Sequence, residues 1–268
     1  MLYDKQKFEG NRVKLRLIFS YLLVMNLAFA DDDFKMLEGK YNYFESLRAC
    51  GTQLGKPWRV PEIWELFELR GQSKTYGEDK RFWSGNTLGE ARMVKMIRHE
   101  NEYFVNDKNI PAFAFYLQDG DITPTPKMIK AYLICTKQKK VFPSDDDFQK
   151  VSHGVKDSRN FLLWETEDKK RRALKLNYDE AKNYCEDLDL HGRVWRLPTL
   201  EELYGIVNYN YVKPSTNKKI FGPMARKYYW SETEFGLDAA YVVGFSVGSV
   251  ATSALNNKSH FRCVSENE

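Results

Sequence analysis

The phrase Trp-Arg-aliphatic-Pro-x-x-x-Glu-Leu occurs twice in this chain of 268 residues, at residues 58–66 and 195–203. A cysteine precedes each copy, and an aromatic-Trp-Ser group follows each copy, at residues 82–84 and 229–231. The same order of landmarks at a spacing of about 130 residues indicates a duplicated domain, because solenoid repeats have periods of only about 20–50 residues. The chain is therefore predicted to contain two copies of one folding unit.

Each copy begins with a signal for the start of a helix. Residues 42–50 and 177–185 both read Asn-Tyr-x-Glu-x-x-x-x-Cys. The Asn is a preferred N-cap, and the Glu three residues later can bond back to the cap's own amide. Thr199 and Glu202 form a second capping box after the repeated phrase, whereas Glu62 is a weaker cap at the matching place. Two helices are thus predicted in each copy.

The last third of each copy reads as a hairpin. Apolar side chains alternate along residues 113–117 and 241–245, and a glycine follows each run, at Gly120 and Gly248. Each glycine stands fifteen residues before the last cysteine of its copy. Alternation before a glycine turn predicts a half-buried strand that enters a hairpin.

Four cysteines remain in a chain whose start indicates export. An even number in an oxidising compartment favours disulfides, and four cysteines permit three connectivities. Metal and catalytic thiol sites are less favoured, because the chain lacks Cys-x-x-Cys spacing. The register of the repeat selects two bonds, each joining the first helix of a copy to its last strand: Cys50 with Cys135, and Cys185 with Cys263.

Residues 1–30 resemble a secretory signal peptide, with basic residues before an apolar run at 17–30. That run is shorter than the ~20 residues that span a bilayer, although an uncleaved anchor is the alternative. Without residues 1–30 the chain has 36 basic and 35 acidic residues, and no later stretch is apolar enough to span a bilayer. We therefore expect an exported protein with no transmembrane segment after signal removal and no nucleic-acid partner.

The repeat also sets the expected domain boundaries. The first domain is predicted at residues 34–137 and the second at 158–268. Residues 138–157 carry charge, Pro and Gly with little periodicity, and they are predicted to form a linker. Residues 160–176 read as two strands around a charged turn.

The second copy resembles the Legionella collagen-like protein C-terminal domain family. The resemblance rests on the repeated phrase, on YYWSETE at residues 228–234 and on FRCV at 261–264. The first copy resembles a diverged member, with AYLIC in place of the last motif. The resemblance implies an α+β fold of two tandem C-type-lectin-like domains, in which two helices pack on short twisted antiparallel sheets. It further implies a location in the periplasm or at the cell surface of a bacterium and adhesion or envelope roles, with binding of sulfated glycans in the namesake.

The repeated tryptophans and arginines have two interpretations. They could form a binding platform, with Trp stacking on a sugar and Arg holding an anion. Their retention in both copies favours a framework in which Trp is buried at the start of a helix and Arg bonds backbone carbonyls. Ser84 and Ser231 are expected to bond nearby backbone groups. The framework residues are Trp58, Arg59, Pro61, Trp83, Trp195, Arg196, Pro198 and Trp230.

Two groups of side chains in the second copy are candidates for binding. The run KKRR could hold sulfate or uronate groups, and a charged hairpin turn is the alternative. Tyrosines offer large amphipathic faces, although some of those near residues 209–229 are expected to be core. The candidate binding residues are Lys169, Lys170, Arg171, Arg172, Tyr209, Tyr211 and Tyr228.

No catalytic constellation is evident in the sequence. The four histidines lack partners at a recognisable spacing. The acidic runs 31–33 and 145–147 lack the pattern of a calcium loop and are interpreted as solvated. We therefore expect a non-catalytic binding or scaffolding protein with no cofactor and no metal. Its partner is expected to be an envelope or surface protein or an anionic glycan; an enzyme on a formylglycine-generating-enzyme-like scaffold is the alternative.

Overall fold

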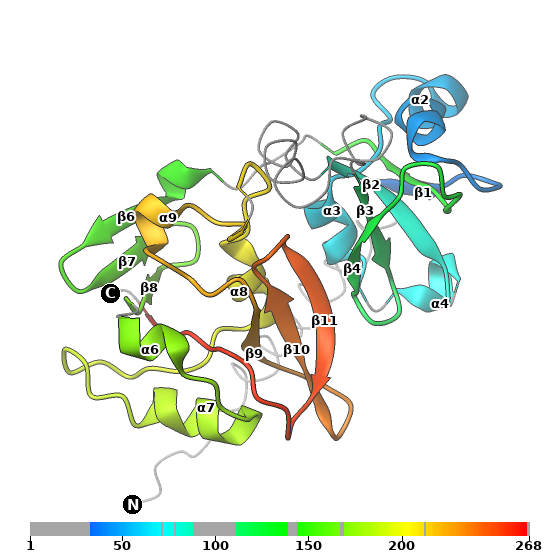
Figure 1. Ribbon diagram of the computed structural model, residues 1–268. Coiled ribbons are helices and arrows are strands. Elements are labelled where there is room, and N and C mark those ends of the chain that lie inside the picture. The colour runs from blue at the N-terminus through cyan, green and yellow to red at the C-terminus, as the bar shows by residue number, and fades with distance from the viewer. Residues whose placement is uncertain are drawn as a thin grey trace, which may run out of the picture.

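The computed structural model describes residues 33–70, 72–77, 79–87, 111–138, 144–166, 169–211 and 213–266. The predicted signal peptide lies outside these residues. The N-terminal half, residues 33–138, and the C-terminal half, residues 144–266, lie side by side (Figure 1). Both mix short helices with small antiparallel sheets, so the predicted α+β class is confirmed. No helix in the described ranges is long and apolar enough to cross a membrane.

The elements of the N-terminal half are β1 (Phe34–Met36), α2 (Tyr43–Leu54), α3 (Ile63–Glu68), α4 (Ser73–Tyr76), β2 (Arg81–Thr87), β3 (Ala112–Tyr116), β4 (Ile122–Thr125) and β5 (Ile134–Thr136). Those of the C-terminal half are η2 (Asp145–Asp147), β6 (Phe148–Val151), β7 (Gly154–Asp157), β8 (Leu162–Trp164), α6 (Lys169–Ala173), α7 (Tyr178–Glu186), α8 (Leu200–Gly205), α9 (Lys218–Phe221), β9 (Tyr228–Phe235), β10 (Ala239–Gly244), β11 (Ser249–Ala254) and β12 (Val264–Glu266).

The capping boxes start the helices where the sequence predicts them. In α2, Asn42 Oδ1 accepts the Glu45 amide at 3.0 Å, and Glu45 Oε2 accepts the Asn42 amide at 2.8 Å. The same pair of bonds joins Asn177 and Glu180 at 2.9 and 3.0 Å at the start of α7. Reciprocal caps satisfy amide groups that have no partner inside a helix.

One six-stranded antiparallel sheet runs through both halves in the order β2-β3-β4-β11-β10-β9. The predicted hairpins turn at Gly120 and Gly248, which have positive φ angles of 72° and 78°. Their second strands, β4 and β11, pair through Ile122 and Val250. Each hairpin thereby covers an edge that would otherwise leave backbone groups unpaired. Figure 1 shows β4 and β11 facing each other near the middle of the molecule.

Both faces of β3 and β10 are buried, so the prediction that these strands are half-buried is wrong. Phe82 and Phe115 point into one apolar cluster, while Trp83 and Ala114 point into another on the opposite face. The alternation follows from the strand, in which neighbouring side chains point to opposite faces. Ala114 pairs with Trp83 across the β2–β3 ladder, and its small side chain accommodates the indole.

The larger cluster joins the two halves. The rings of Trp64 and Phe67 on α3 pack on Tyr204 of α8, with centroid distances of 4.2 and 5.1 Å. Arg70 Nη2 donates to Glu201 Oε1 at 2.5 Å across the same junction. The regions predicted as domains at residues 34–137 and 158–268 are therefore joined, because one sheet and one apolar core are shared between the halves.

The predicted linker is wrong for residues 148–157. These residues form β6 and β7, which pair with each other and extend β8 and β12 into a four-stranded sheet. Phe148 and Val155 are buried in the shared cluster, which explains why this polar stretch is ordered as strands. Residues 139–143 lie outside the described ranges.

The predicted pair of strands at residues 160–176 is half wrong. Leu162–Trp164 forms β8, but the charged run forms helix α6 in place of a hairpin turn. Lys, Arg and Ala are good helix formers. The position of the helix is set by a buried ion pair described below.

Both predicted disulfides are present. Cys50 in α2 is bonded to Cys135 in β5, and Cys185 in α7 is bonded to Cys263 just before β12. The Cα–Cα distances are 5.6 and 5.5 Å. Each bond joins the first long helix of its half to the C-terminal strand region, as the repeat register predicts.

Candidate functional site

The repeated Arg and Glu form a local clamp. Arg196 Nη1 and Nη2 each donate to Glu202 at 2.8 Å, and Glu202 Oε2 also accepts the Thr199 amide at 2.8 Å. One carboxylate thus caps α8 and fixes the arginine, while Arg196 Nη1 bonds the carbonyl of Leu197 at 3.0 Å. The bonds to Glu202 hold the pKa of Arg196 above its ordinary value. This arrangement matches the predicted framework role of the phrase.

The N-terminal half repeats the clamp. Arg59 donates to both carboxylate oxygens of Glu65 and to the carbonyls of Val60 and Gln138. Glu65 in turn accepts the Glu62 amide at 2.7 Å. The bonds to Glu65 also raise the pKa of Arg59. A bidentate Arg–carboxylate pair is geometrically specific, which explains why the phrase needs both residues six positions apart.

The tryptophans of the phrase differ in burial. Trp195 is fully buried, and its Nε1 donates to the Leu190 carbonyl at 3.0 Å. Trp58 is only half-buried, with Lys137 Nζ 5.7 Å from its ring centroid. The expectation of a buried ring holds for Trp195 and is wrong for Trp58. Pro61 and Pro198 are both buried, and their carbonyls accept the Gly85 and Glu232 amides at 2.8 and 2.7 Å.

The aromatic-Trp-Ser groups are framework as well. Trp83 Nε1 donates to a backbone carbonyl at 2.8 Å and Trp230 Nε1 does so at 3.0 Å, and both rings are fully buried. Ser84 and Ser231 each donate to the carbonyl of a neighbouring strand at 3.0 Å. Buried polar groups of this kind require partners. The predicted backbone role of both serines is confirmed.

Helix α6 carries the candidate basic run, and its third residue is not a surface ligand. Arg171 Nε lies 2.9 Å from Glu165 Oε1, and both side chains are buried. The guanidinium carbon lies 4.5 Å from the ring centroid of Tyr184 and 3.7 Å from that of Phe261. Glu165 Oε2 also accepts the Cys263 amide at 2.9 Å. Arg171 therefore fixes α6 to the disulfide region, which corrects its prediction as a free sulfate-gripping residue.

A pocket of about 500 Å³ opens between α6 and α7. Lys170 is exposed at its rim, whereas the side chain of Lys169 lies outside the described residues and Arg172 is half-buried outside the lining. Its lining thus combines an exposed cation, a fixed guanidinium, an aromatic ring and apolar carbons: Lys170, Arg171, Ala173, Leu174 and Tyr184. Such a lining can stack a sugar ring and attract an anionic group.

The predicted tyrosine surface is not assembled. Tyr209 bonds Tyr204 and the Gly248 carbonyl through its hydroxyl, and its ring packs on Phe113 at 4.6 Å in the junction between the halves. Burial raises the pKa of Tyr209 well above its ordinary range. Tyr211 and Tyr228 come from a loop and from the first residue of β9. Tyr228 is 46% exposed, and neither residue lines the α6–α7 pocket.

The acidic run 145–147 is not simply solvated. Asp145 accepts hydrogen bonds from Asn208 at 3.1 Å, Tyr211 at 2.8 Å and Asn217 at 2.7 Å. This carboxylate therefore anchors the loop that follows α8. In the described part of the chain, no group of three or more His, Cys, Asp or Glu side chains is placed to hold a metal ion.

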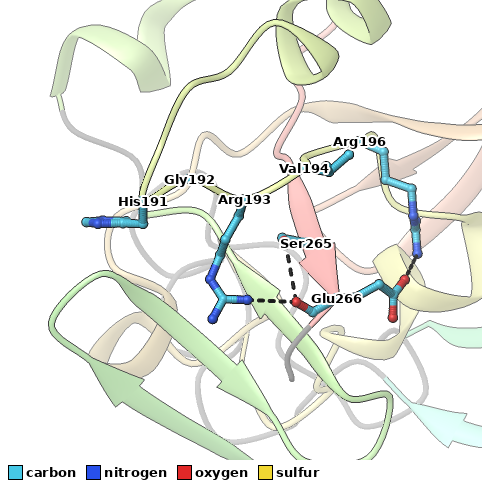
Figure 2. A pocket seen from close by; sticks show the side chains of 7 residues that line it. All are labelled: His191, Gly192, Arg193, Val194, Arg196, Ser265 and Glu266. Atoms are coloured by element: carbon cyan, nitrogen blue, oxygen red, sulfur yellow. Dashed lines mark hydrogen bonds and ion pairs between the residues drawn. The ribbon is translucent and has the colours of Figure 1, made fainter.

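A second pocket, of about 410 Å³, lies beside the clamp in the C-terminal half. Figure 2 shows His191 pointing away from the other lining side chains, while Arg193 and Arg196 reach the backbone and carboxylate of Glu266. Arg193 Nη1 donates to the Glu266 carbonyl at 2.9 Å, and Arg196 Nη2 lies 3.0 Å from Glu266 Oε1. Protein oxygens already accept from these two arginines, as Glu165 does from Arg171, but the α6–α7 pocket also has the exposed Lys170 in its lining.

Residues 153–265 match the Lcl C-terminal domain family. The match begins in the β6–β7 hairpin and ends in β12, so it contains the α6–α7 pocket and most of the C-terminal half. The N-terminal half lies outside it. No curated protein sequence matches the chain.

Three lining residues of the α6–α7 pocket were missed from sequence, namely Ala173, Leu174 and Tyr184, and so was Glu165, which fixes Arg171. Tyr184 directly precedes Cys185, and the matching residue of the N-terminal half is Ala49. The repeated cysteine therefore follows an aromatic residue in one copy only, and this difference between the copies could have indicated a binding residue. Glu165 left no such signal, because its role depends on the distant partners Arg171 and Cys263.

His260 lies behind α6 and gives this region a pH dependence. Its side chain is almost fully buried. Burial and the nearby charges of Lys175 and Arg171 lower the pKa of His260, although hydrogen bonds to the backbone of Arg172 and Leu174 act in the opposite direction. The folded protein therefore keeps this imidazole neutral at pH values below about 6.5, where a free histidine begins to bind a proton.

We expect stability to fall with acidification through this group. Below pH ~6.5 the unfolded chain binds a proton at His260 that the folded chain resists, so the stabilisation present above that pH is lost as the pH falls. The free energy of unfolding should decrease more between pH 7 and pH 5 in the wild type than in His260→Gln, as measured by urea denaturation. Parallel pH profiles for the two proteins would contradict this role.

Proposed function

We propose that this chain is an exported, non-catalytic binding protein whose C-terminal half binds an anionic glycan in the α6–α7 pocket. The observation that carries the proposal is the lining of that pocket, where exposed Lys170 and the ring of Tyr184 flank the buried guanidinium of Arg171. Aromatic faces with nearby cations suit sugars that bear sulfate or carboxylate groups. The Lcl C-terminal domain match covers the whole pocket.

We further propose that the two halves are tandem C-type-lectin-like domains. Matched residues make matched contacts: the disulfides, the Arg–Glu clamps and the indole hydrogen bonds recur in both halves. The central sheet is also symmetric in its strand order: β2, β3 and β4 from one edge match β9, β10 and β11 from the other. These features support duplication of one unit, with glycan binding kept in the half that has α6.

An oxidising location outside the cytoplasm is supported by the two disulfides, since such bonds persist there. The disulfides also bear on the alternative of a formylglycine-generating-enzyme-like activity. All four cysteines of the chain are bonded in pairs, so none offers a thiol for cysteine chemistry. The binding proposal therefore has the stronger physical support.

A charge reversal at the pocket rim should test the proposal. We expect Lys170→Glu to weaken binding of a sulfated polysaccharide by roughly fivefold to tenfold, because one partly exposed charge contact contributes about 1 kcal/mol. The dissociation constant would be measured by calorimetry on residues 31–268, which contain every described residue. Binding should also weaken between 50 and 500 mM salt as charges are screened.

Lys258→Glu is the matched control, because Lys258 is also exposed in the C-terminal half but does not line the pocket. We expect less than a twofold change for it. Equal loss in both variants would indicate a general charge effect and would overturn the pocket assignment. Unchanged binding in Lys170→Glu would do the same.

A further inference from the structure

The N-terminal half exposes a group of large apolar side chains at one end of the molecule. Phe44 and Leu47 lie one turn apart on α2, and Met128 and Ile129 lie in the turn after β4. Their side chains are between 40% and 60% exposed. The turn is attached to the helix, since the Tyr43 amide donates to the Lys127 carbonyl at 2.9 Å. We call these four side chains the α2 patch.

The fold does not require this patch. The matching four positions of the C-terminal half, in the same order, are Asp179, Lys182, Asn256 and Asn257. The backbone there is the same, because the Tyr178 amide donates to the Leu255 carbonyl at 3.0 Å. The same helix-and-turn arrangement therefore carries polar side chains in the C-terminal half and apolar side chains in the N-terminal half. Exposing the apolar side chains to water is unfavourable, so packing of the fold does not account for them.

A basic pocket adjoins the α2 patch at Phe44. Lys40, Arg48 and Lys130 line a pocket of about 650 Å³ that also includes Phe44. Lys127, which is only 3% exposed, has its Nζ 5.6 Å from the ring centroid of Phe44 and lies beneath this surface. Glu45 is the acidic side chain among the described lining residues, and its carboxylate caps α2. The surface thus joins apolar side chains to a basic pocket.

We propose that the α2 patch rests on an anionic phospholipid membrane, with the apolar side chains at the acyl boundary and the basic pocket at the headgroups. The apolar side chains suit the acyl chains of an anionic lipid, and the basic pocket suits its headgroup. Basic residues near an anionic membrane surface add electrostatic attraction. This inference uses the exported location proposed above and does not depend on glycan binding.

Geometry allows both surfaces to act at once. In Figure 1, α2 lies at the outer end of the N-terminal half, and α6 and α7 lie at the opposite end of the molecule. A membrane at α2 would therefore lie at the end of the molecule away from α6 and α7.

Vesicle flotation tests the membrane proposal on residues 31–268. The key variant carries Phe44→Asp, Leu47→Lys, Met128→Asn and Ile129→Asn, which are the residues of the C-terminal half and leave the net charge unchanged. The wild type should float with vesicles of equal phosphatidylcholine and phosphatidylglycerol, and its apparent affinity should fall about tenfold or more in the variant. Pure phosphatidylcholine vesicles should bind the wild type much more weakly.

The matched control is Phe161→Asn with Leu237→Asn, which removes two exposed apolar side chains from the C-terminal half. We expect its flotation to equal that of the wild type. If the fourfold variant fails to fold, Met128→Asn with Ile129→Asn alone tests the exposed turn. The proposal would be overturned if the wild type did not float, if the variants floated equally well, or if the patch supported dimerisation in sedimentation velocity and no lipid binding. Polysaccharide affinity should stay unchanged throughout, which separates this test from the glycan proposal.

Discussion

Removing either disulfide is expected to lower the free energy of unfolding by about 4 to 5 kcal/mol. The two bonds close segments of 85 and 78 residues. On the chain-entropy description, the gain depends only on the logarithm of the loop length, so both bonds should contribute nearly equally. Equal contributions would be notable because the two halves otherwise differ in sequence.

Paired alanine substitutions test this expectation without leaving a free thiol. Cys50→Ala with Cys135→Ala would be compared with Cys185→Ala with Cys263→Ala by urea denaturation. A single transition is expected in each variant, because the halves share a core. Losses below about 1 kcal/mol would show that the unfolded chain stays compact without the bonds, and two separate transitions would show that the shared core does not couple the halves.

Replacing Trp195 by alanine should lower the free energy of unfolding by about 3 to 5 kcal/mol, whereas Trp58→Ala should lower it by less than about 2 kcal/mol. The two residues occupy the same place in the repeated phrase, so each serves as the control for the other. Trp195 is fully buried and hydrogen-bonded, and its loss leaves a cavity beside Cys185. Trp58 is half-buried, so water can fill part of the space that its ring vacates.

Urea denaturation of both variants gives the comparison, and polysaccharide binding of the folded fraction is the second readout. Binding should survive in Trp195→Ala wherever the protein remains folded. The framework interpretation would be wrong if Trp195→Ala kept the wild-type stability and lost binding. It would also be wrong if both substitutions had the same effect on stability.

The junction between the halves changes how the protein can be dissected. The central sheet continues from β4 into β11, and the α3 and α8 rings stack across the same junction. A fragment that begins near residue 142 would expose the edge of β11 and the apolar face of Tyr204. Functional tests of the C-terminal half are therefore better made by substitution in the two-half chain than by truncation.

The sequence by itself determined the local and periodic features. Capping boxes depend on residues three positions apart, and the hairpins depend on alternation and a glycine, so both were predictable from short stretches. The disulfide pairing was predictable because two copies of one phrase set a common register. Retention of that phrase in both copies indicated a framework role, but the pairing of its Arg with its Glu was seen only in the structure.

Only the tertiary structure decided where the copies meet and which charged groups are free. Pairing of Ile122 with Val250 joins residues far apart in the chain, and no local pattern encodes that choice. Arg171 looked like its neighbour Lys170 in the sequence, yet distant Glu165 and Phe261 bury it and leave the lysine exposed. Burial and pairing depend on contacts made after the chain has folded, which is why the pocket and the α2 patch appeared only in the structure.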